Sequence, residues 1–484
     1  MTEVGASAPA LKRRLGLGDA VLIGLGSMIG AGVFAVWGPV ARTGVDAPQM
    51  LLALLIAGAV AVANGLSSAQ LAAQYPTSGG AYVPARERLG AWPGFLAGWS
   101  FTIGKTASCA AMAATFATYA IPAADGWQRP VAALALVVVL GVNLGGVTRT
   151  AQAARILVIP VLVILVGVVV LGLTATTPAL SSASSASPGI LPTLDPSAYL
   201  GVPGAGSADA PARYVAVPAD PWSSPLAGIG WLTPPGSGET PGPLAVLTAS
   251  GLLFFAFAGY ARITTLGEEV VRPRRTIPRA VVIALAVVIV IYLAVAVAVL
   301  RAVPPWRLAV SPAPLAEVVA HAGPVAVIVV TVGAALASLG ALLALVTGVS
   351  RTALAMARTG DLPRILARVD ARRSVPWAAE VAVALVAVVL VLTLDVRSVI
   401  GFSSFGVLLY YLVANATALT QASGHRFVPR AVSVLGALGC VTLAVALPPL
   451  SVVVGAAVLL VGVLARLAAH AVSRRRRGAR SRPR

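Results

Sequence analysis

Long apolar runs, separated by short polar segments, make up most of the chain. A helix that crosses a bilayer needs about 20 mostly apolar residues. Twelve runs of this kind cover residues 19–40, 48–72, 92–120, 129–147, 155–173, 244–267, 280–300, 324–349, 376–394, 398–420, 431–448 and 450–471. The pattern predicts an all-α integral membrane protein with twelve transmembrane helices. Pro448 and Pro449 leave room only for a tight turn between the last two helices.

The composition agrees with a protein that lies in lipid. Of the 484 residues, 58% are hydrophobic and 11% are charged, whereas about 25% of the residues of a soluble domain are charged. Both cysteines, Cys109 and Cys440, lie in apolar runs, which argues against a disulfide framework. The first residues, MTEVGASAPALKRR, stay polar for too long to form a signal peptide.

The positions of the basic residues predict the orientation. Alternate connections, together with both ends of the chain, carry 27 of the 35 basic residues, and the opposite connections carry six. Because cytoplasmic connections are enriched in Lys and Arg, both termini are expected in the cytoplasm of a plasma-membrane protein. The net charge of +19 is therefore a topology signal and not a sign of nucleic-acid binding. The basic end, SRRRRGARSRPR, is expected to touch anionic lipid.

One connection differs from the others. Residues 174–243, between the fifth and sixth runs, are rich in Ser, Pro, Gly and Ala. A segment of this composition cannot bury enough apolar surface to fold by itself. We expect an irregular extracellular insert that is not a binding module.

The first apolar run contains GLGSMIGAGVF, with glycines at 24, 26, 30 and 32. Glycines permit a break in the helix, and a break exposes N–H groups at the positive end of the outer half-helix, where a carboxylate can bind. Close helix packing through Gly26-x-x-x-Gly30 explains the same glycines equally well.

The sixth run, GLLFFAFAGYARITTLGEEV, is also interrupted, by Gly259 and then by Arg262 and two threonines. Broken helices in corresponding positions of two halves indicate a transporter built from inverted repeats. The repeats would be residues 19–173 and 244–420. Two further helices would occupy 421–471, between a tail of residues 1–18 and a basic tail of residues 472–484.

Four segments together resemble the amino acid–polyamine–organocation (APC) superfamily. They are GLGSMIGAGVF, YPTSGGAY (Tyr75 to Tyr82), FFAFAGYARITTLGEEVVRPRRTIPRA (Phe254 to Ala280) and SRTALAMARTGDLP (Ser350 to Pro363). They follow in the order and at the places that this family has. The resemblance implies a secondary amino acid permease of the bacterial type, which works by alternating access and is a symporter that takes up its substrate with protons.

The resemblance also implies the binding residues. In such proteins the substrate carboxylate meets N–H groups of the first break, here those of Met28, Ile29, Gly30, Ala31 and Gly32. The substrate amino group meets carbonyls of the sixth-run break around Gly259, here those of Phe255, Ala256 and Ala258. Phe257 and Tyr260 would shape or cover the side-chain pocket, and Tyr260 and Arg262 are expected to act in gating.

Two polar segments have a structural interpretation beside a functional one. Gly79 and Gly80 are expected to form a cytoplasmic turn that lets the second and third helices approach, with gating as the alternative. Glu268 and Glu269 are expected to pair with nearby arginines such as Arg272 or Arg275 rather than with substrate.

Lys105, in the middle of the third run, is the candidate for coupling. Some proton-coupled members of the family carry a lysine in the fifth helix, but ARILVIPVLVILVGVVV has none, and Pro160 and Val161 occupy that region. Insertion of a lysine at this depth of the bilayer costs at least ~2.5 kcal/mol of free energy. Such a residue is therefore expected to have a function. The alternative is an ammonium group bonded to carbonyls of a broken helix, with a purely structural role.

The remaining expectations concern substrate and class. No acidic residue lies near the middle of a predicted helix, so a neutral amino acid is favoured and an anionic one stays open. The rivals are a cationic amino acid or polyamine exchanger, and a channel or sensor on the same scaffold. The apolar runs hold no cluster of catalytic groups, so no enzyme, cofactor or metal is expected, and the oligomeric state does not follow from the sequence.

Overall fold

The computed structural model describes residues 15–77, 79–121, 126–175, 242–370, 372–373, 375–394 and 396–480, and these form helices and turns with two isolated β-bridges. The helices are α1 (Leu17–Met28), α2 (Ala31–Ala35), α3 (Trp37–Ala41), α4 (Ala47–Gln74), α5 (Tyr82–Arg88), α6 (Ala91–Ala120), α7 (Gln128–Leu144), α8 (Val147–Thr174), α9 (Pro243–Phe257), α10 (Ala261–Thr264), α11 (Pro273–Ala302), α12 (Pro305–Val310), α13 (Pro314–Val318), α14 (Pro324–Arg358), α15 (Trp377–Thr393), α16 (Val396–Leu419), α17 (Arg430–Ala446) and α18 (Pro449–Arg480). A 3₁₀ turn, η3 (Ala258–Tyr260), joins α9 to α10.

Eight helical segments of the described chain are long and apolar enough to cross a bilayer. They are Leu17–Ala35, Ala47–Gln74, Ile156–Thr174, Pro243–Thr264, Pro273–Ala302, Pro324–Arg358, Val399–Leu419 and Pro449–Ala469. Three shorter apolar helices, α7, α15 and α17, coincide with further predicted runs. The 30-residue α6 coincides with the run at 92–120.

The outward faces of these helices are apolar. On α8, Ile156, Val163 and Val166 are 72%, 68% and 61% exposed. A water-soluble protein rarely exposes continuous apolar surface of this kind, whereas lipid tails are a suitable partner for it. The chain is therefore a multi-pass membrane protein with an all-helical fold.

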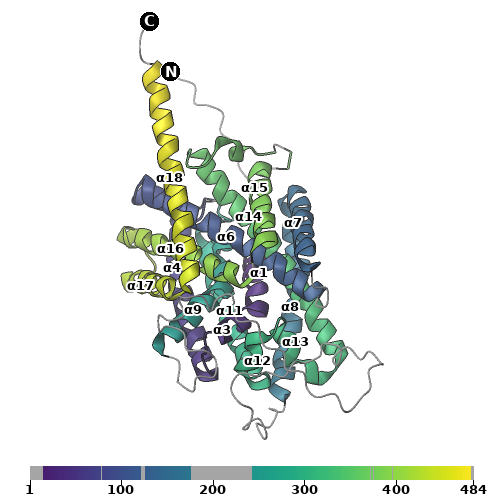
Figure 1. Cartoon of the computed structure of the whole chain (residues 1–484). Coiled ribbons are helices and arrows are strands. Elements are labelled where there is room, and N and C mark those ends of the chain that lie inside the picture. Colours follow the sequence, from purple (N-terminus) through teal and green to yellow (C-terminus); the bar gives the residue numbers. More distant parts are fainter. Residues whose placement is uncertain are drawn as a thin grey trace.

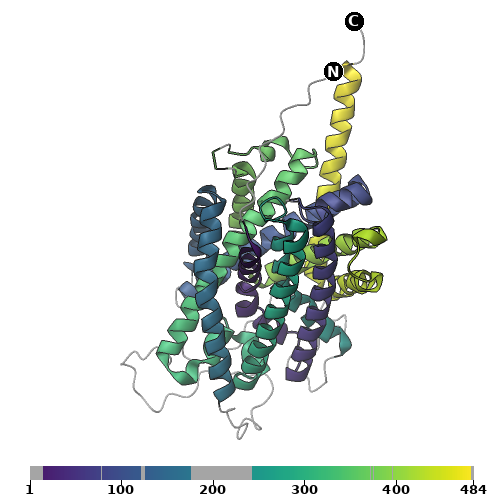
Figure 2. The ribbon, with the colours of Figure 1, turned by 180° about the vertical axis from the view of Figure 1, so that it is seen from behind.

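The interrupted first span lies in the middle of the bundle. Both views show α1 enclosed by longer helices (Figures 1 and 2), and it contacts α8, α11 and α14. The last helix, α18, lies at an edge of the bundle and extends beyond the other helices (Figure 1). The residues that break α1 are thus buried in protein and do not face lipid.

Several boundaries differ from the expected ones. The helix expected to end at residue 349 continues to Arg358, because Arg351, which interrupts the apolar run, is itself buried. Helix α18 continues to Arg480, so the expected tail from residue 472 is mostly helical. The sequence pattern missed the short helices α5, α12 and α13, of which the last two start at prolines. Residues 176–241 of the expected insert lie outside the described residues.

Candidate functional site

The first span breaks at Ile29 and Gly30, inside the glycine-rich stretch. Helix α1 ends at Met28, Ile29 and Gly30 leave the helical conformation, and α2 starts at Ala31. The N–H of Ile29 donates to the carbonyl of Leu25 at 2.7 Å, and the N–H of Gly30 donates to that of Met28 at 3.0 Å. The segment is therefore not a continuous helix in which the glycines serve only close packing.

These bonds correct the expected set of N–H donors. Met28 is the last residue of α1, and the N–H groups of Ile29 and Gly30 are already used within the break. The first N–H groups of a helix have no intrahelical acceptor. The donors that the break offers therefore belong to the first turn of α2, at Ala31 and Gly32.

The sixth span is interrupted in a different way from the first. Helix α9 ends at Phe257, the chain tightens into the 3₁₀ turn η3, and α10 continues for one turn from Ala261 to Thr264. The expected break at Ala258 and Gly259 is present, but it is a local tightening and not an extended segment. A 3₁₀ turn shifts the hydrogen bonds by one residue, which changes the partners of the neighbouring carbonyls.

The two interruptions touch each other backbone to backbone. A methyl group added to Gly32 would lie 2.6 Å from Cα of Ala256. One added to Gly259 would overlap the carbonyl of Ser27 and lie 2.6 Å from the nitrogen of Met28. Real Cβ atoms do not approach other atoms this closely. Glycine is required at both positions because the main chains pass in direct contact.

Tyr292 of α11 completes this contact, and the sequence analysis did not include it. Its hydroxyl group lies 2.6 Å from the carbonyl oxygen of Met28 and 3.1 Å from that of Ala256, so that its single O–H has two acceptors within reach. Its ring meets that of Phe257 edge-on, with centroids 5.0 Å apart. The available signal was a single tyrosine in the otherwise apolar run VVIVIYLAVAV.

The aromatic residues expected around the site form two groups. Phe257 packs on Tyr292, while Tyr260 stacks on Tyr411 of α16 with ring centroids 4.9 Å apart. Phe254 meets the same Tyr411 edge-on at 6.0 Å. All of these side chains are buried. The site is thus enclosed by rings from the sixth span, α11 and α16.

Lys105 lies on α6 and is 3% exposed. It shares a helix face with Met112, seven residues further on, and the sulfur of Met112 would be 3.2 Å from a methyl group at Gly30. Within the described residues, no hydrogen bond or ion pair to Lys105 is formed, which leaves the structural alternative, an ammonium group bonded to carbonyls of a broken helix, without support. The buried arginines Arg351 and Arg466, in contrast, both contact carboxylates.

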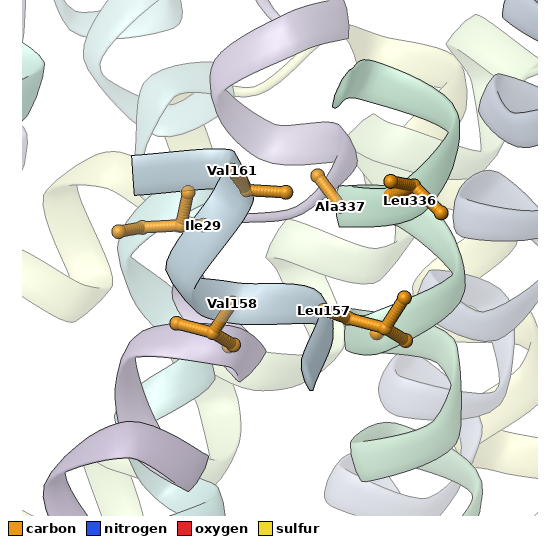
Figure 3. Close-up of a pocket in the computed structure, with 8 residues that line it drawn as sticks. Ile29, Leu157, Val158, Val161, Leu336 and Ala337 are labelled. Carbon is orange, nitrogen blue, oxygen red and sulfur yellow. The ribbon is translucent and has the colours of Figure 1, made fainter. Parts of the chain in front are cut away.

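A narrow apolar crevice without room for a water molecule lies beside the first break (Figure 3). It is lined by Ile29 of the break and by side chains of α8 and α14, among them Val158, Val161 and Ala337. Its lining contains no charged or hydroxyl side chain. The fifth-helix region that carries a lysine in some members of the family is therefore apolar in this chain, as the sequence indicated at Val161.

Four buried charges cluster at the end of α10. Glu269 forms an ion pair with Arg351 of α14, and Glu380 of α15 interacts electrostatically with both Arg351 and Arg262. Their residues are between 1% and 5% exposed. The expected pairing of Glu269 with Arg272 or Arg275 was wrong.

The two glycines of the motif YPTSGGAY pack against segments far away in the chain. Gly80 has a positive φ of 56°, and a methyl group there would lie 3.4 Å from Thr265. A methyl group at Gly79 would lie 3.3 Å from Ala355 of α14. The N–H of Ala81 donates to the hydroxyl of Tyr410 at 2.8 Å. The two glycines therefore allow contact with the sixth span, α14 and α16, and not only with neighbouring helices.

Asp361, at the end of the motif SRTALAMARTGDLP, joins three elements. Its carboxylate accepts from Tyr82 at 2.7 Å and from Arg86 at 2.6 Å, both on α5. It also pairs at 2.8 Å with Arg466 of α18, whose guanidinium group lies 4.5 Å from the ring centroid of Trp92. The last helix is thus attached to α5 and to the end of α14.

Comparison with known proteins gives the family. The model of the amino acid permease family matches residues 15–466. An uncharacterized transporter of Mycobacterium tuberculosis is 47% identical over 470 residues, which cover 96% of this chain and 93% of the relative. The vacuolar cationic amino acid transporter 2 of Arabidopsis thaliana is 26% identical over 442 residues, or 87% of this chain and 60% of the relative.

The human cationic amino acid transporter 4 is likewise 26% identical, over 83% of this chain and 58% of its own length. These matches confirm the resemblance to the APC superfamily and point to a transporter and not to an enzyme. Together with the two interrupted spans, they show that the chain belongs to the amino acid permease family.

Proposed function

We propose that the protein is a secondary active transporter that takes up an amino acid together with protons by alternating access. The contact between the two interrupted spans carries this proposal. The start of α2 lies against the last turn of α9, because a methyl group added to Gly32 would lie 2.6 Å from Cα of Ala256. The N–H end of one helix and the carbonyl end of the other carry opposite partial charges. An amino acid presents the complementary pair, a carboxylate and an ammonium group.

In this proposal the amino acid carboxylate binds the N–H groups of Ala31 and Gly32, and the ammonium group binds carbonyls around Ala256. Phe255, Ala258 and Gly259 belong to the same interrupted stretch, and Phe257 and Tyr260 border the substrate side chain. The arrangement follows the general logic of broken helices in transporters.

The proposed architecture has twelve membrane-spanning helices in two inverted repeats, residues 19–173 and 244–420, with two appended helices in 421–471. Helix α6 and the shorter α7, α15 and α17 would join the eight long apolar segments. Both termini would be cytoplasmic, in the plasma membrane, and the insert at 174–243 would be extracellular. The interrupted spans at the start of each repeat support this division.

The substrate is proposed to carry no positive side chain. The buried carboxylates nearest to the sixth span, those of Glu269 and Glu380, already interact with arginines. A free carboxylate that could bind a cationic side chain is thus not supplied by this cluster. A cationic amino acid is the second candidate, because relatives at 26% identity are named cationic amino acid transporters.

The first experiment is uptake of labelled alanine, glutamate and arginine into proteoliposomes, with and without a pH gradient. Acceleration by unlabelled substrate inside the vesicles identifies a carrier, because a channel or a sensor gives no counterflow. Uptake of arginine alone would establish the cationic alternative. Absence of any uptake and counterflow, in correctly folded protein, would refute the proposed function.

Lys105 is proposed as the residue that couples proton movement to transport. Its side chain is buried without an anionic partner among the described residues, and an ionisable residue at this depth is a functional candidate by default. In Lys105→Met, pH-driven accumulation should be lost while exchange of substrate persists. Lys12→Met, a change of the only other lysine, is the matched control. Unchanged pH dependence in Lys105→Met would contradict coupling through this residue.

A further inference from the structure

The hydroxyl group of Tyr292 lies where the ends of two helices converge. It is 2.6 Å from the carbonyl oxygen of Met28, at the end of α1, and 3.1 Å from that of Ala256, in the last turn of α9. The residue is 2% exposed. One side chain from a third helix thus links the two interruptions.

The last carbonyls of a helix have an incomplete set of N–H partners. They also carry the negative end of the helix dipole. A carbonyl oxygen has two lone pairs, and that of Met28 accepts one bond from the N–H of Gly30 at 3.0 Å. A donor placed between Met28 and Ala256 uses acceptor capacity that the main chain leaves over at Met28. Tyr292 supplies one O–H, and its ring is fixed against Phe257 at a centroid distance of 5.0 Å.

We propose that the Tyr292 hydroxyl stands in for the ammonium group of the substrate when the carrier is empty. This inference rests on the proposed function, in which the carbonyl of Ala256 receives that ammonium group. An ammonium group has three N–H donors and a full positive charge, so it satisfies both carbonyls better than a single neutral O–H. On binding, it displaces the hydroxyl from the two oxygens.

Tyr292 is accordingly a positioning residue of the empty state. The empty carrier needs it to keep the two interruptions together while it reorients, and the loaded carrier has the ammonium group instead. Net uptake includes the return of the empty carrier in every cycle. Exchange of internal for external substrate does not include that step, so the two modes depend on the hydroxyl to different extents.

The test compares net uptake with exchange in Tyr292→Phe, which removes the hydroxyl and keeps the ring. Proteoliposomes are prepared with and without unlabelled substrate inside, and the probe is whichever of labelled alanine, glutamate or arginine the wild-type protein transports fastest. Because the loss of a buried hydrogen bond changes an equilibrium by up to about tenfold, the ratio of exchange to net uptake should rise by up to about tenfold.

Tyr119→Phe is the matched control. Tyr119 is also buried, and its hydroxyl donates to one backbone carbonyl, that of Phe34 in α2, at 3.0 Å. That acceptor does not lie between the two interruptions, so the control should change both modes by the same factor. An unchanged ratio in Tyr292→Phe, or an equal rise in Tyr119→Phe, would overturn the inference.

Thermal unfolding in detergent provides a second measurement. Saturating substrate should raise the unfolding temperature of Tyr292→Phe by more than it raises the unfolding temperature of the wild type. The reason is that the ammonium group of the ligand replaces the missing donor. If Tyr292→Phe can be purified only with substrate present, the inference is supported. If substrate does not rescue the variant, the hydroxyl is needed in the loaded state as well and the inference fails.

The failure of this inference can be told from the failure of the proposed function. Wild-type protein that transports none of the three amino acids overturns both. An active wild type, with an unchanged ratio of exchange to net uptake in Tyr292→Phe, overturns the inference alone.

Discussion

The contact between the two interrupted spans can be tested with one methyl group, in Gly259→Ala. Gly259 does not have a positive φ, so alanine is excluded by space and not by backbone conformation. Its Cβ would overlap the carbonyl of Ser27 and lie 2.6 Å from the nitrogen of Met28. Both obstacles are backbone atoms, which cannot rotate away. The end of α1 and the turn η3 must therefore move apart.

The expected magnitude follows from the cost of overpacking, about 1–3 kcal/mol for an extra methyl group in a close-packed region. The displaced Met28 also carries the carbonyl that lies 2.6 Å from the Tyr292 hydroxyl, so the shift reaches the proposed binding groups. Because about 1.4 kcal/mol corresponds to a tenfold change in Kd, substrate affinity should fall by about tenfold or more.

The assay combines thermal unfolding of the purified protein with equilibrium binding of a labelled amino acid. Gly141→Ala is the matched control, because α7 leaves nothing within 4 Å of the added methyl group. This control should stay within about 0.5 kcal/mol of the wild type. Wild-type stability and affinity in Gly259→Ala would refute the close approach of the spans. Reduced stability with unchanged affinity would refute the link between this contact and binding.

Three other predictions follow from particular contacts and from the proposed topology. Asp361→Asn should lower the free energy of unfolding by about 3 kcal/mol, because it leaves the buried Arg466 without its ion pair; thermal unfolding checks this, and an unchanged midpoint would contradict the attachment of α18. Burial, followed by the hydrogen bond to Asp361, raises the pKa of Tyr82 to about 12, so unfolding releases a proton between pH 10 and 12 and stability falls as the pH rises through this window. Tyr82→Phe should show a smaller fall, and an identical pH dependence of unfolding would refute this assignment. Single cysteines should be labelled from outside only at 174–243 and from inside only at 350–375, and the reverse pattern would invert the proposed orientation.

The sequence predicted the helical fold because membrane helices leave a direct signal in the length of apolar runs. Each expected run overlaps a helix or an interrupted helix. The errors lie where a polar residue is buried by a partner far away in the chain. Arg351 ends the apolar run at residue 349, yet α14 continues through it because Glu269 supplies a buried counter-charge.

The sequence offered the interruption of the first span as one of two alternatives, because close helix packing explains its glycines equally well. The second interrupted run was what favoured a break. The form of the second interruption was not predictable. Whether the chain tightens into a 3₁₀ turn at Ala258 or opens into an extended segment depends on which atoms pack against Gly259, and those belong to Ser27 and Met28. Tyr292 was missed for the same reason, since its acceptor on Met28 is 264 positions away.

The corrected partner of Glu269 links the start of the first span to the end of the sixth. The backbone carbonyl of Glu269 accepts from the N–H of Leu15 at 3.0 Å, and the N–H of Val271 donates to the carbonyl of Leu15 at 2.9 Å. The start of α1 and the segment after α10 are therefore held together as one unit by their main chains.

The side chain of Glu269 attaches this unit to Arg351 of α14. The nearby Arg272 and Arg275 are exposed to solvent and cannot offset the desolvation of a buried carboxylate as a buried arginine can. Any movement of the unit away from α14 has to separate this ion pair. Arg351 would not be left without an anion, because Glu380 on α15 already interacts with it. Two carboxylates around one arginine thus reduce the electrostatic cost of moving α1, since the charge that stays behind retains a partner.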